Sequence, residues 1–282
     1  MHGDVAAWRS GRIIRGLAAV LVATLTLTLS SCGRSPLDVS EVTGPRIVIG
    51  VTFDQPGMGL RKGSQYSGFN IEVAEYVARK LGYAKWQIVW EEAPYDQRVS
   101  MLANGDVDMV TGMYVDKTTA ADDSAMNALG YDFVGPYLDG RQDVMMLAQD
   151  ADDIHTIGDL AGRHVCVVSG SRTVDDLQQA LGASVTLLEQ PSATQCTTAL
   201  MTGMVDAVSA EAAVLAGMVA SADTAKVTTL GLDYAQGQYG IGLKTGSDKL
   251  SSEVKKALDG MEQDGSLTRA YADTLGRIGY RA

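Results

Sequence analysis

The residues of this chain that could do chemistry are few, and they favour binding over catalysis. His155 and His164 stand outside any spacing that holds zinc. No Gly-x-Ser-x-Gly or P-loop pattern is present, and Gly57-x-Gly59 has no third glycine where a dinucleotide site needs one. We therefore expect no catalytic residue, no metal and no cofactor, and we predict that the protein is not an enzyme.

Three cations stand where they could bind an anion. Arg172 follows Gly170-Ser171 and opens a predicted helix, whose N–H groups and dipole also favour a negative group. Arginine binds a carboxylate as a planar fork, whereas lysine is a point charge. Arg172 is therefore our first candidate, with Lys117 and Arg141 as the others. Each of the three could instead be a solvated surface residue.

Strands that alternate with helices must position these residues. Hydrophobic periodicity predicts a first series with strands at 46–52, 86–91 and 107–111 and helices at 69–82 and 95–105. In the second of these helices we expect Val99 and Leu102 to face inward. After a turn at Asp139-Gly140, a strand at 142–148 leads to a second series. Its strands are expected at 164–168, 184–189 and 205–210, and its helices at 173–182, 192–203 and 211–220.

The end of the chain cannot complete the second series alone. Strands are expected at 227–232 and 239–246, followed by helices at 248–263 and 266–275. We expect this tail to return to the first series. The predicted fold is α/β, with two doubly wound lobes joined by a two-strand hinge. Lobe 1 would be 46–141 plus 238–282 and lobe 2 would be 142–237, an arrangement that closes on a ligand.

The N-terminus has the pattern of an export signal. Three arginines precede an apolar run from Leu17 to Leu29, which is too short to span a bilayer. The following Ser30-Ser31-Cys32 resembles the bacterial lipobox, which implies a signal peptide at 1–31, lipid on Cys32 and a tether at 32–45. An ordinary cleaved signal with a nearby cysteine is the alternative. The prediction places the protein outside the cytoplasm, anchored to the cell membrane by lipid.

Net charge and cysteine content limit the partners and the cross-links that the protein can have. A formal charge of −11, with no basic patch, argues against nucleic acid as a partner. If Cys32 carries lipid, Cys166 and Cys196 remain. In an exported chain they could form a disulfide, or they could be two buried thiols.

Six stretches, at 47–83, 102–110, 132–138, 164–171, 196–208 and 239–250, resemble one family in order and spacing. They are similar to bacterial extracellular solute-binding proteins, family 3, of polar amino-acid ABC transporters, and specifically to actinobacterial glutamate- or glutamine-binding lipoproteins. The resemblance implies a periplasmic-binding-protein-like fold. It also implies a monomer that captures an amino acid or related small polar solute and delivers it to an ABC transporter permease. The family's paired cysteines match Cys166 and Cys196.

The same resemblance implies a set of ligand-binding residues. Glu211 falls where the family has the acidic residue for the α-ammonium, and Tyr95 falls where it has a stacking aromatic. The other matching positions are Phe53, Asp54, Gly112, Met113, Tyr114, Gly170 and Ser171. Arg172 departs from the pattern, because the family reads Gly-Ser-Thr where this chain reads Gly170-Ser171-Arg172-Thr173.

The match fails where the family has its clamp arginine for the α-carboxylate. After the third strand this chain reads Val115-Asp116-Lys117-Thr118-Thr119-Ala120, with no arginine. Arg172, Lys117 or Arg141 would have to replace it, and we expect altered specificity. The alternatives are a sensory or interaction lipoprotein that feeds no transporter, and a dehydratase-like enzyme on the same fold.

Overall fold

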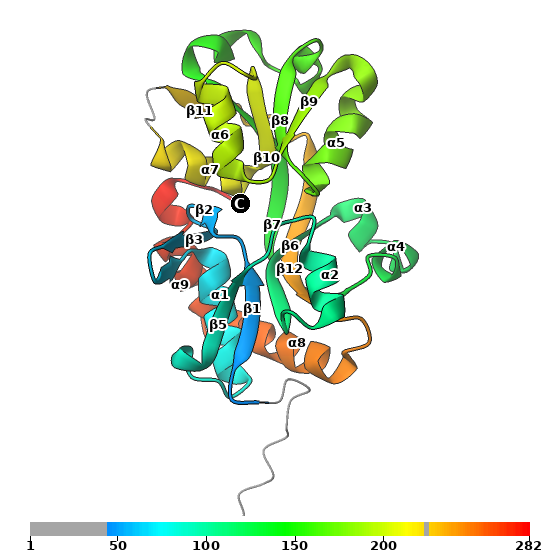
Figure 1. The fold of residues 1–282 in the computed structure, drawn as a ribbon, viewed down its shortest axis with the longest axis vertical. Coiled ribbons are helices and arrows are strands. Elements are labelled where there is room, and N and C mark those ends of the chain that lie inside the picture. The colour runs from blue at the N-terminus through cyan, green and yellow to red at the C-terminus, as the bar shows by residue number, and fades with distance from the viewer. Residues whose placement is uncertain (1–43, 223–225) are drawn as a thin grey trace, which may run out of the picture. The chain divides into compact units, whose positions relative to one another are not determined.

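The computed structural model describes residues 44–222 and 226–282 (Figure 1). The predicted signal peptide at 1–31, the lipid site at Cys32 and nearly all of the tether at 32–45 lie outside the described residues. In the described part of the chain, no helix has the length and apolar character needed to cross a membrane.

The first α/β unit is built on three parallel strands. Strand β1 (Ile47–Val51) lies between β5 (Ile88–Glu92) and β6 (Met109–Asp116). Helix α1 (Phe69–Lys80) buries Phe69, Val73 and Val77, which recur four residues apart and so share one face. Helix α2 (Arg98–Asn104) ends at Gly105 in the left-handed conformation, as the sequence predicts. A small sheet joins β1 to α1, with strands β2 (Asp54–Gln55), β3 (Gly59–Lys62) and β4 (Gln65–Ser67).

The second α/β unit repeats this plan. Strand β8 (His164–Val168) lies parallel to both β9 (Thr186–Gln190) and β10 (Ala207–Glu211). Its helices are α5 (Arg172–Leu181), α6 (Ala193–Met201) and α7 (Ala212–Ser221). The predicted disulfide is confirmed: Cys166 in β8 is bonded to Cys196 in α6, with Cα atoms 5.5 Å apart. The bond fixes α6 against the sheet.

Two long strands join the units. Strand β7 (Asp132–Leu147) pairs antiparallel with β10, and β12 (Ala235–Leu243) pairs antiparallel with both β7 and β6. The sheet therefore runs in the order β5-β1-β6-β12-β7-β10-β8-β9, with β11 (Val227–Thr229) also on β7. The structure thus has the predicted two-lobe α/β fold with a two-strand hinge. The residue boundaries of the lobes stay a prediction.

One expected feature of the hinge is wrong. The turn predicted at Asp139-Gly140 does not form, and β7 is continuous for 16 residues. Gly140 instead pairs with Gly237 of β12. A Cβ on Gly140 would lie 2.7 Å from Tyr114 and 2.9 Å from Tyr239, so the glycine makes room for two rings and does not reverse the chain.

The chain closes with two helices on the first lobe, as predicted. Helix α8 (Asp248–Gln263) buries Val254, Leu258 and Met261 and packs against α1. Helix α9 (Ser266–Asp273) follows it. The remaining short elements are α3 (Lys117–Ala120), α4 (Asp123–Asn127), and the 3₁₀ helices at Lys85–Gln87, Ala148–Asp153, Ile157–Leu160, Gly182–Ser184 and Gly276–Ile278.

Candidate ligand-binding site

Tyr95 and Glu211 meet where the two lobes face each other. Glu211 is the last residue of β10 and is only 1% exposed. The Tyr95 hydroxyl donates to the Glu211 carboxylate at 3.3 Å and accepts from Gln55 Nε2 at 3.0 Å. Burial raises the pKa of Glu211, although nearby Arg98 and the Tyr95 hydroxyl lower it in part. Burial thus disfavours the ionised form of Glu211 unless a positive group pairs with it.

Arg98 is a site residue that the sequence reading missed. Its guanidinium carbon lies 3.9 Å from the centre of the Tyr95 ring, and the residue is 4% exposed. Arg98 Nε donates to the Ala93 carbonyl and Nη1 to the Gly112 carbonyl. Val99, which was expected to face inward, is 40% exposed, so that expectation is wrong. The sequence signal that could have identified Arg98 is its spacing of three residues from Tyr95, which places the two side chains on one side of a helical start.

Two tyrosines, Tyr114 and Tyr239, lie close enough to Glu211 to feel the charge of its carboxylate. Tyr114 of β6 lies opposite Tyr239 of β12, and their rings make an edge contact at 5.1 Å. Both hydroxyls are buried and have no hydrogen-bond partner. Burial and the charge of Glu211 raise the pKa of both phenols. The phenols therefore remain protonated and neutral, with lone pairs available to a ligand.

Arg172, our first candidate for the ligand's negative end, is held by carboxylates. Its Nε lies 3.0 Å from Asp176, its Nη2 lies 3.4 Å from Asp116 and its Nη1 lies 3.8 Å from Asp175. Asp176 is 5% exposed, and its second oxygen has no partner. Burial raises the pKa of Asp176, and Arg172 opposes that shift. The arginine therefore joins the start of α5 to the end of β6.

Two further buried atoms beside α5 lack partners. Ser171 caps the helix, and its Oγ is unsatisfied. Gln142 of β7 pairs with Glu211 and accepts from the Thr173 hydroxyl at 2.8 Å, but its Nε2 is unsatisfied. Buried polar atoms are normally satisfied. Gln142 Nε2, Ser171 Oγ and Asp176 Oδ2 are thus buried polar atoms near the start of α5 without a protein partner.

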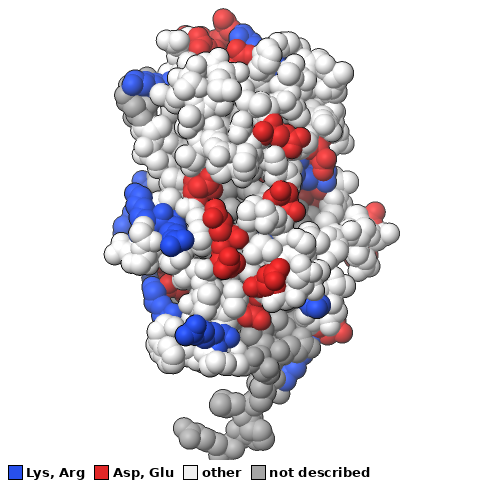
Figure 2. Space-filling model, in the orientation of Figure 1, with Lys and Arg blue, Asp and Glu red and all other residues white. Residues whose placement is uncertain are grey.

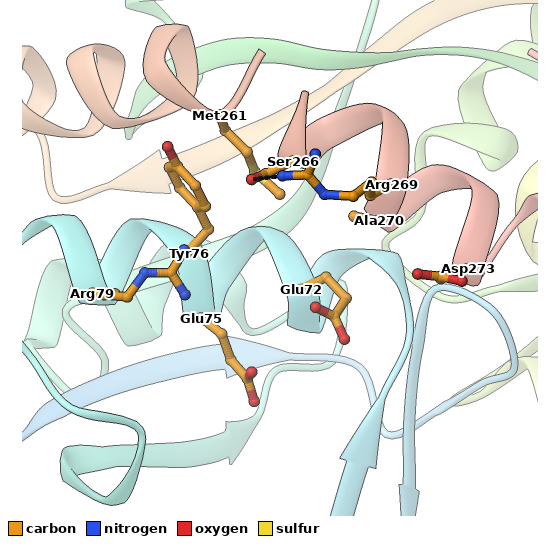
Figure 3. A pocket seen from close by; sticks show the side chains of 9 residues that line it. All are labelled: Glu72, Glu75, Tyr76, Arg79, Met261, Ser266, Arg269, Ala270 and Asp273. Carbon is orange, nitrogen blue, oxygen red and sulfur yellow. Dashed lines mark hydrogen bonds between the residues drawn. The ribbon is translucent and has the colours of Figure 1, made fainter. Parts of the chain in front are cut away.

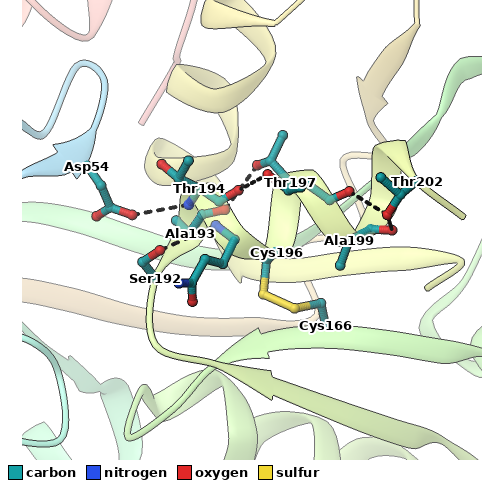
Figure 4. The surroundings of a disulfide bond; sticks show 11 residues. Asp54, Cys166, Ser192, Ala193, Thr194, Cys196, Thr197, Ala199 and Thr202 are labelled. Atoms are coloured by element: carbon teal, nitrogen blue, oxygen red, sulfur yellow. Dashed lines mark hydrogen bonds between the residues drawn. A yellow bond between two sulfur atoms is a disulfide. The ribbon is translucent and has the colours of Figure 1, made fainter. Parts of the chain in front are cut away.

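Phe53 lies apart from this cluster, whereas Asp54 lines a small pocket together with Gln55 and Tyr95. Phe53 packs on Tyr66, with ring centres 5.3 Å apart, and lines a pocket of about 520 Å³ that faces α6 and α7. Asp54 accepts from the Thr194 backbone N–H at 3.1 Å, near the start of α6 (Figure 4). The Asp54 carboxylate therefore ties the lobes together in this structure.

Gly112 and Met113 were predicted to line the cleft with their backbone. In the structure both residues make contacts within the first lobe. The Gly112 N–H donates to the Tyr137 hydroxyl at 2.8 Å, and its carbonyl accepts from Arg98. Met113 is 5% exposed and packs in the core.

The remaining predicted site residues are Lys117, Arg141 and Gly170. Lys117 is exposed at the start of α3. Arg141 pairs with Asp233 and lies 5.1 Å from the Tyr280 ring centre. Gly170, at φ 72°, brings its backbone against Asp96, and a Cβ there would lie 2.7 Å from the Asp96 Cα. Gly170 therefore makes a close contact between the lobes.

The described residues hold no group of three or more side chains suited to a metal ion. A separate pocket of about 260 Å³ lies between α1 and α9 and contains none of the predicted residues (Figure 3). Its lining carries charges of both signs, from Glu72, Glu75, Arg79, Arg269 and Asp273.

Fold and site together define a two-lobe receptor for a small solute. The model for bacterial extracellular solute-binding proteins, family 3, matches residues 47–277, and the chain belongs to this family. The chain is 32% identical to the glutamate-binding protein GluB of Corynebacterium glutamicum, over 94% of this chain and 92% of that protein. It is 27% identical to the ABC transporter glutamine-binding protein GlnH of Bacillus subtilis, over 80% of each.

Solved structures support the fold. An ancestral arginine-binding protein bound to glutamine matches with a TM-score of 0.72 and 24% identity, over 83% of this chain and 100% of that one. A solute receptor for L-cysteine from Neisseria gonorrhoeae matches with a TM-score of 0.73 and 22% identity, over 83% and 91%.

Proposed function

We propose that this protein is the substrate-binding lipoprotein of an ABC importer and captures an amino acid or a related small polar solute between its lobes. Family membership and the names of its relatives support an amino-acid-type ligand and a permease as partner. Asp54, Tyr95, Gly170 and Glu211 all make contacts between the lobes, which supports capture by closure.

One observation carries the proposal. The Glu211 carboxylate is almost wholly buried at a contact between the lobes, where the Tyr95 hydroxyl donates to it. A buried carboxylate is costly unless it is paired, and a positively charged group of a solute held between the lobes would pair it. We propose Tyr95, Tyr114, Ser171, Arg172 and Glu211 as the ligand-facing members of the predicted set. Lys117 and Arg141 stay alternatives to Arg172 as the replacement for the family's clamp arginine.

Binding is tested by native mass spectrometry of the co-purifying solute, followed by calorimetry with a panel of amino acids and amines. Glu211→Gln should weaken binding of the solute about tenfold or more, because it removes a charged hydrogen-bond acceptor. Asp259→Asn, on the far surface of α8, is the matched control and should bind normally. A panel that shows no binding to the wild-type protein would refute the proposal.

Export and anchoring are a separate part of the proposal. The N-terminal sequence supports a signal peptide at 1–31, lipid on Cys32 and a position outside the cytoplasm at the cell membrane. Cys32→Ser should release the protein from the membrane fraction without changing its affinity for the solute. Mass spectrometry of the mature N-terminus identifies the lipid directly. Finding unmodified Cys32 in the membrane-bound protein would refute the proposed lipid anchor.

The lobes are proposed as 46–141 plus 238–282 and 142–237, in a monomer that opens and closes about β7 and β12. Small-angle scattering should show a smaller radius of gyration with solute than without it. A sensory protein would bind and close without supporting uptake, so growth on the solute in a deletion strain separates that alternative. Turnover of the bound solute, followed by NMR, would identify an enzyme instead.

A further inference from the structure

We propose that the first lobe has a surface that docks on an anionic lipid bilayer. Trp86 would insert among the lipids, and anionic headgroups would bind between Lys62 and Lys85. This surface is formed by the end of α1, the 3₁₀ helix at Lys85–Gln87 and the small sheet of β3 and β4. The inference goes beyond solute capture and adds a second contact to the proposed lipid anchor.

Trp86 is the most exposed large hydrophobic side chain of the described residues, at 80%. Its 3₁₀ helix is nevertheless held in place. The side chain of Gln87 accepts from the Ala84 N–H and donates to the Pro45 carbonyl, each at 2.9 Å. An indole has an apolar ring and one N–H donor, and tryptophan is therefore enriched at the interface between membrane and water.

Cations lie on both sides of the chain turn that leads to this tryptophan. From Arg79 to Trp90 the sequence has three cations, Arg79, Lys80 and Lys85, and no carboxylate. All three are exposed, and the 3₁₀ helix packs against α1. Figure 2 shows acidic side chains along the centre of one face, while Lys and Arg gather mainly at one edge. The chain as a whole is acidic, with a net charge of −11, so an anionic bilayer would attract it only through a local group of cations.

A hollow of about 550 Å³ next to the 3₁₀ helix suits an anionic headgroup. Lys62 and Lys85 line it together with Tyr66 and Trp90, whose stacked rings have centres 5.5 Å apart. Glu75 is the one carboxylate in this lining, and it lies 2.7 Å from Lys85. Two lysines and one carboxylate give the hollow a net positive charge. The rings offer an apolar surface to the carbons of a lipid headgroup.

The proposed anchor would keep this surface near the bilayer. Residues 33–43 join Cys32 to Gly44, the first described residue. A fully extended chain of that length spans roughly 40 Å at most. The hydrogen bond from Gln87 to the Pro45 carbonyl shows that the chain enters the lobe beside Trp86. Because the anchor makes the second contact intramolecular, a few cations and one indole can hold the lobe to the bilayer.

Quenching of tryptophan fluorescence by brominated lipids tests the docking. The mature chain is coupled through its Cys32 thiol to a maleimide lipid in vesicles, so the test does not depend on natural lipidation. Trp86 and Trp90 are the tryptophans of the mature chain, and the quenching that Trp86→Phe removes belongs to Trp86. We expect strong quenching of Trp86 by brominated phosphatidylglycerol and much weaker quenching by brominated phosphatidylcholine.

Charge reversal tests the role of the lysines. Lys62→Glu and Lys85→Glu should each lower the equilibrium constant for contact with the anionic vesicle about tenfold, because an anion replaces a cation at an anionic surface. Arg163→Glu makes the same kind of charge change just before β8 in the second lobe, and it should have no effect. Circular dichroism melts confirm that each variant is folded.

The outcomes separate the docking from the proposed function. Absence of Trp86 quenching in the anionic vesicles overturns the inference. Equal quenching in neutral vesicles, or unchanged quenching in both folded lysine variants, also overturns it. Trp86 quenching together with unmodified Cys32 in the native protein would support the docking and refute the lipid anchor. Quenching without binding of any solute would support the docking and refute solute capture.

Discussion

The hydroxyl of Tyr95 and the carboxylate of Glu211 lie 3.3 Å apart although they are 116 residues apart in sequence. Tyr95 precedes α2 in the first α/β unit, and Glu211 ends β10 in the second. Their contact therefore exists only when the two units face each other. Both residues belong to the proposed site, so closure and ligand binding would share one set of groups.

Tyr95→Phe should weaken ligand binding about tenfold while leaving the fold intact. The substitution keeps the ring over Arg98 but removes the hydroxyl that links the lobes and donates to Glu211. Loss of a hydrogen bond to a charged group gives an effect of roughly this size. Calorimetry measures the affinity, and scattering measures closure. Full affinity with normal closure would show that the hydroxyl is not part of the site.

The stability of the ligand-free protein should fall as the pH rises above about 4.5, the ordinary value for Glu211. Burial raises the pKa of Glu211 and of Asp176, so the folded state binds more protons than the unfolded state in this window. Their stabilising contribution is complete below the unfolded pKa values and is lost as the pH passes through the folded ones. Thermal melts across the window measure the effect.

Affinity for a solute that carries an ammonium group should change in the opposite direction. A cation binds best to ionised carboxylates, so calorimetry should show tighter binding as the pH rises through the same window. In Glu211→Gln both dependences should become flatter. A melting temperature of the wild-type protein that rises with pH, together with an unchanged affinity, would contradict the prediction that Glu211 and Asp176 control both pH dependences.

Arg172→Ala should lower the melting temperature and weaken binding of a solute that carries a carboxylate. Asp176 would lose its nearest cation, at 3.0 Å, and stay buried. Removing one partner of a buried ion pair is typically destabilising. Arg172→Lys keeps the charge and is the matched control for stability. Unchanged affinity for such a solute in folded Arg172→Ala would contradict the prediction that Arg172 binds the ligand carboxylate.

Removal of the Cys166–Cys196 bond should destabilise the protein by about 3–4 kcal/mol on the chain-entropy model, since it closes a loop with a separation of 30 residues. For a domain of this size that corresponds to a melting temperature lower by about 10 °C. A Cys166→Ala, Cys196→Ala double variant shows the loss, and a reducing agent should then have no further effect. Equal melting temperatures of the reduced and the oxidised wild-type protein would contradict the predicted stabilisation by the disulfide.

Much of the fold could be predicted from the sequence because its elements have strong periodicity. The helix expected at 248–263 has these same bounds in the structure, with Val254, Leu258 and Met261 on the buried face. The turn expected at Asp139-Gly140 failed for a tertiary reason. The need for Gly140 comes from the rings of Tyr114 and Tyr239, which approach it from other strands.

The site was only partly predictable. Tyr95 and Glu211 follow from the resemblance to the family, but Arg98 does not. An arginine at the start of a helix usually reads as a solvated residue, and Val99 beside it is the more apolar choice for the buried face. Arg98 is buried because the carbonyls of Ala93 and Gly112 satisfy it, and those partners meet only in the folded chain.

The glycines of the two crossing strands leave the tyrosine rings no spare room. A Cβ on Gly237 would lie 2.3 Å from the Tyr114 ring, and one on Gly140 of the neighbouring strand would lie 2.7 Å from the same residue. Bending of β7 or β12 must therefore move Tyr114, a residue of the proposed site. An alanine at either glycine would press on this ring and so disturb the hinge and the proposed site together.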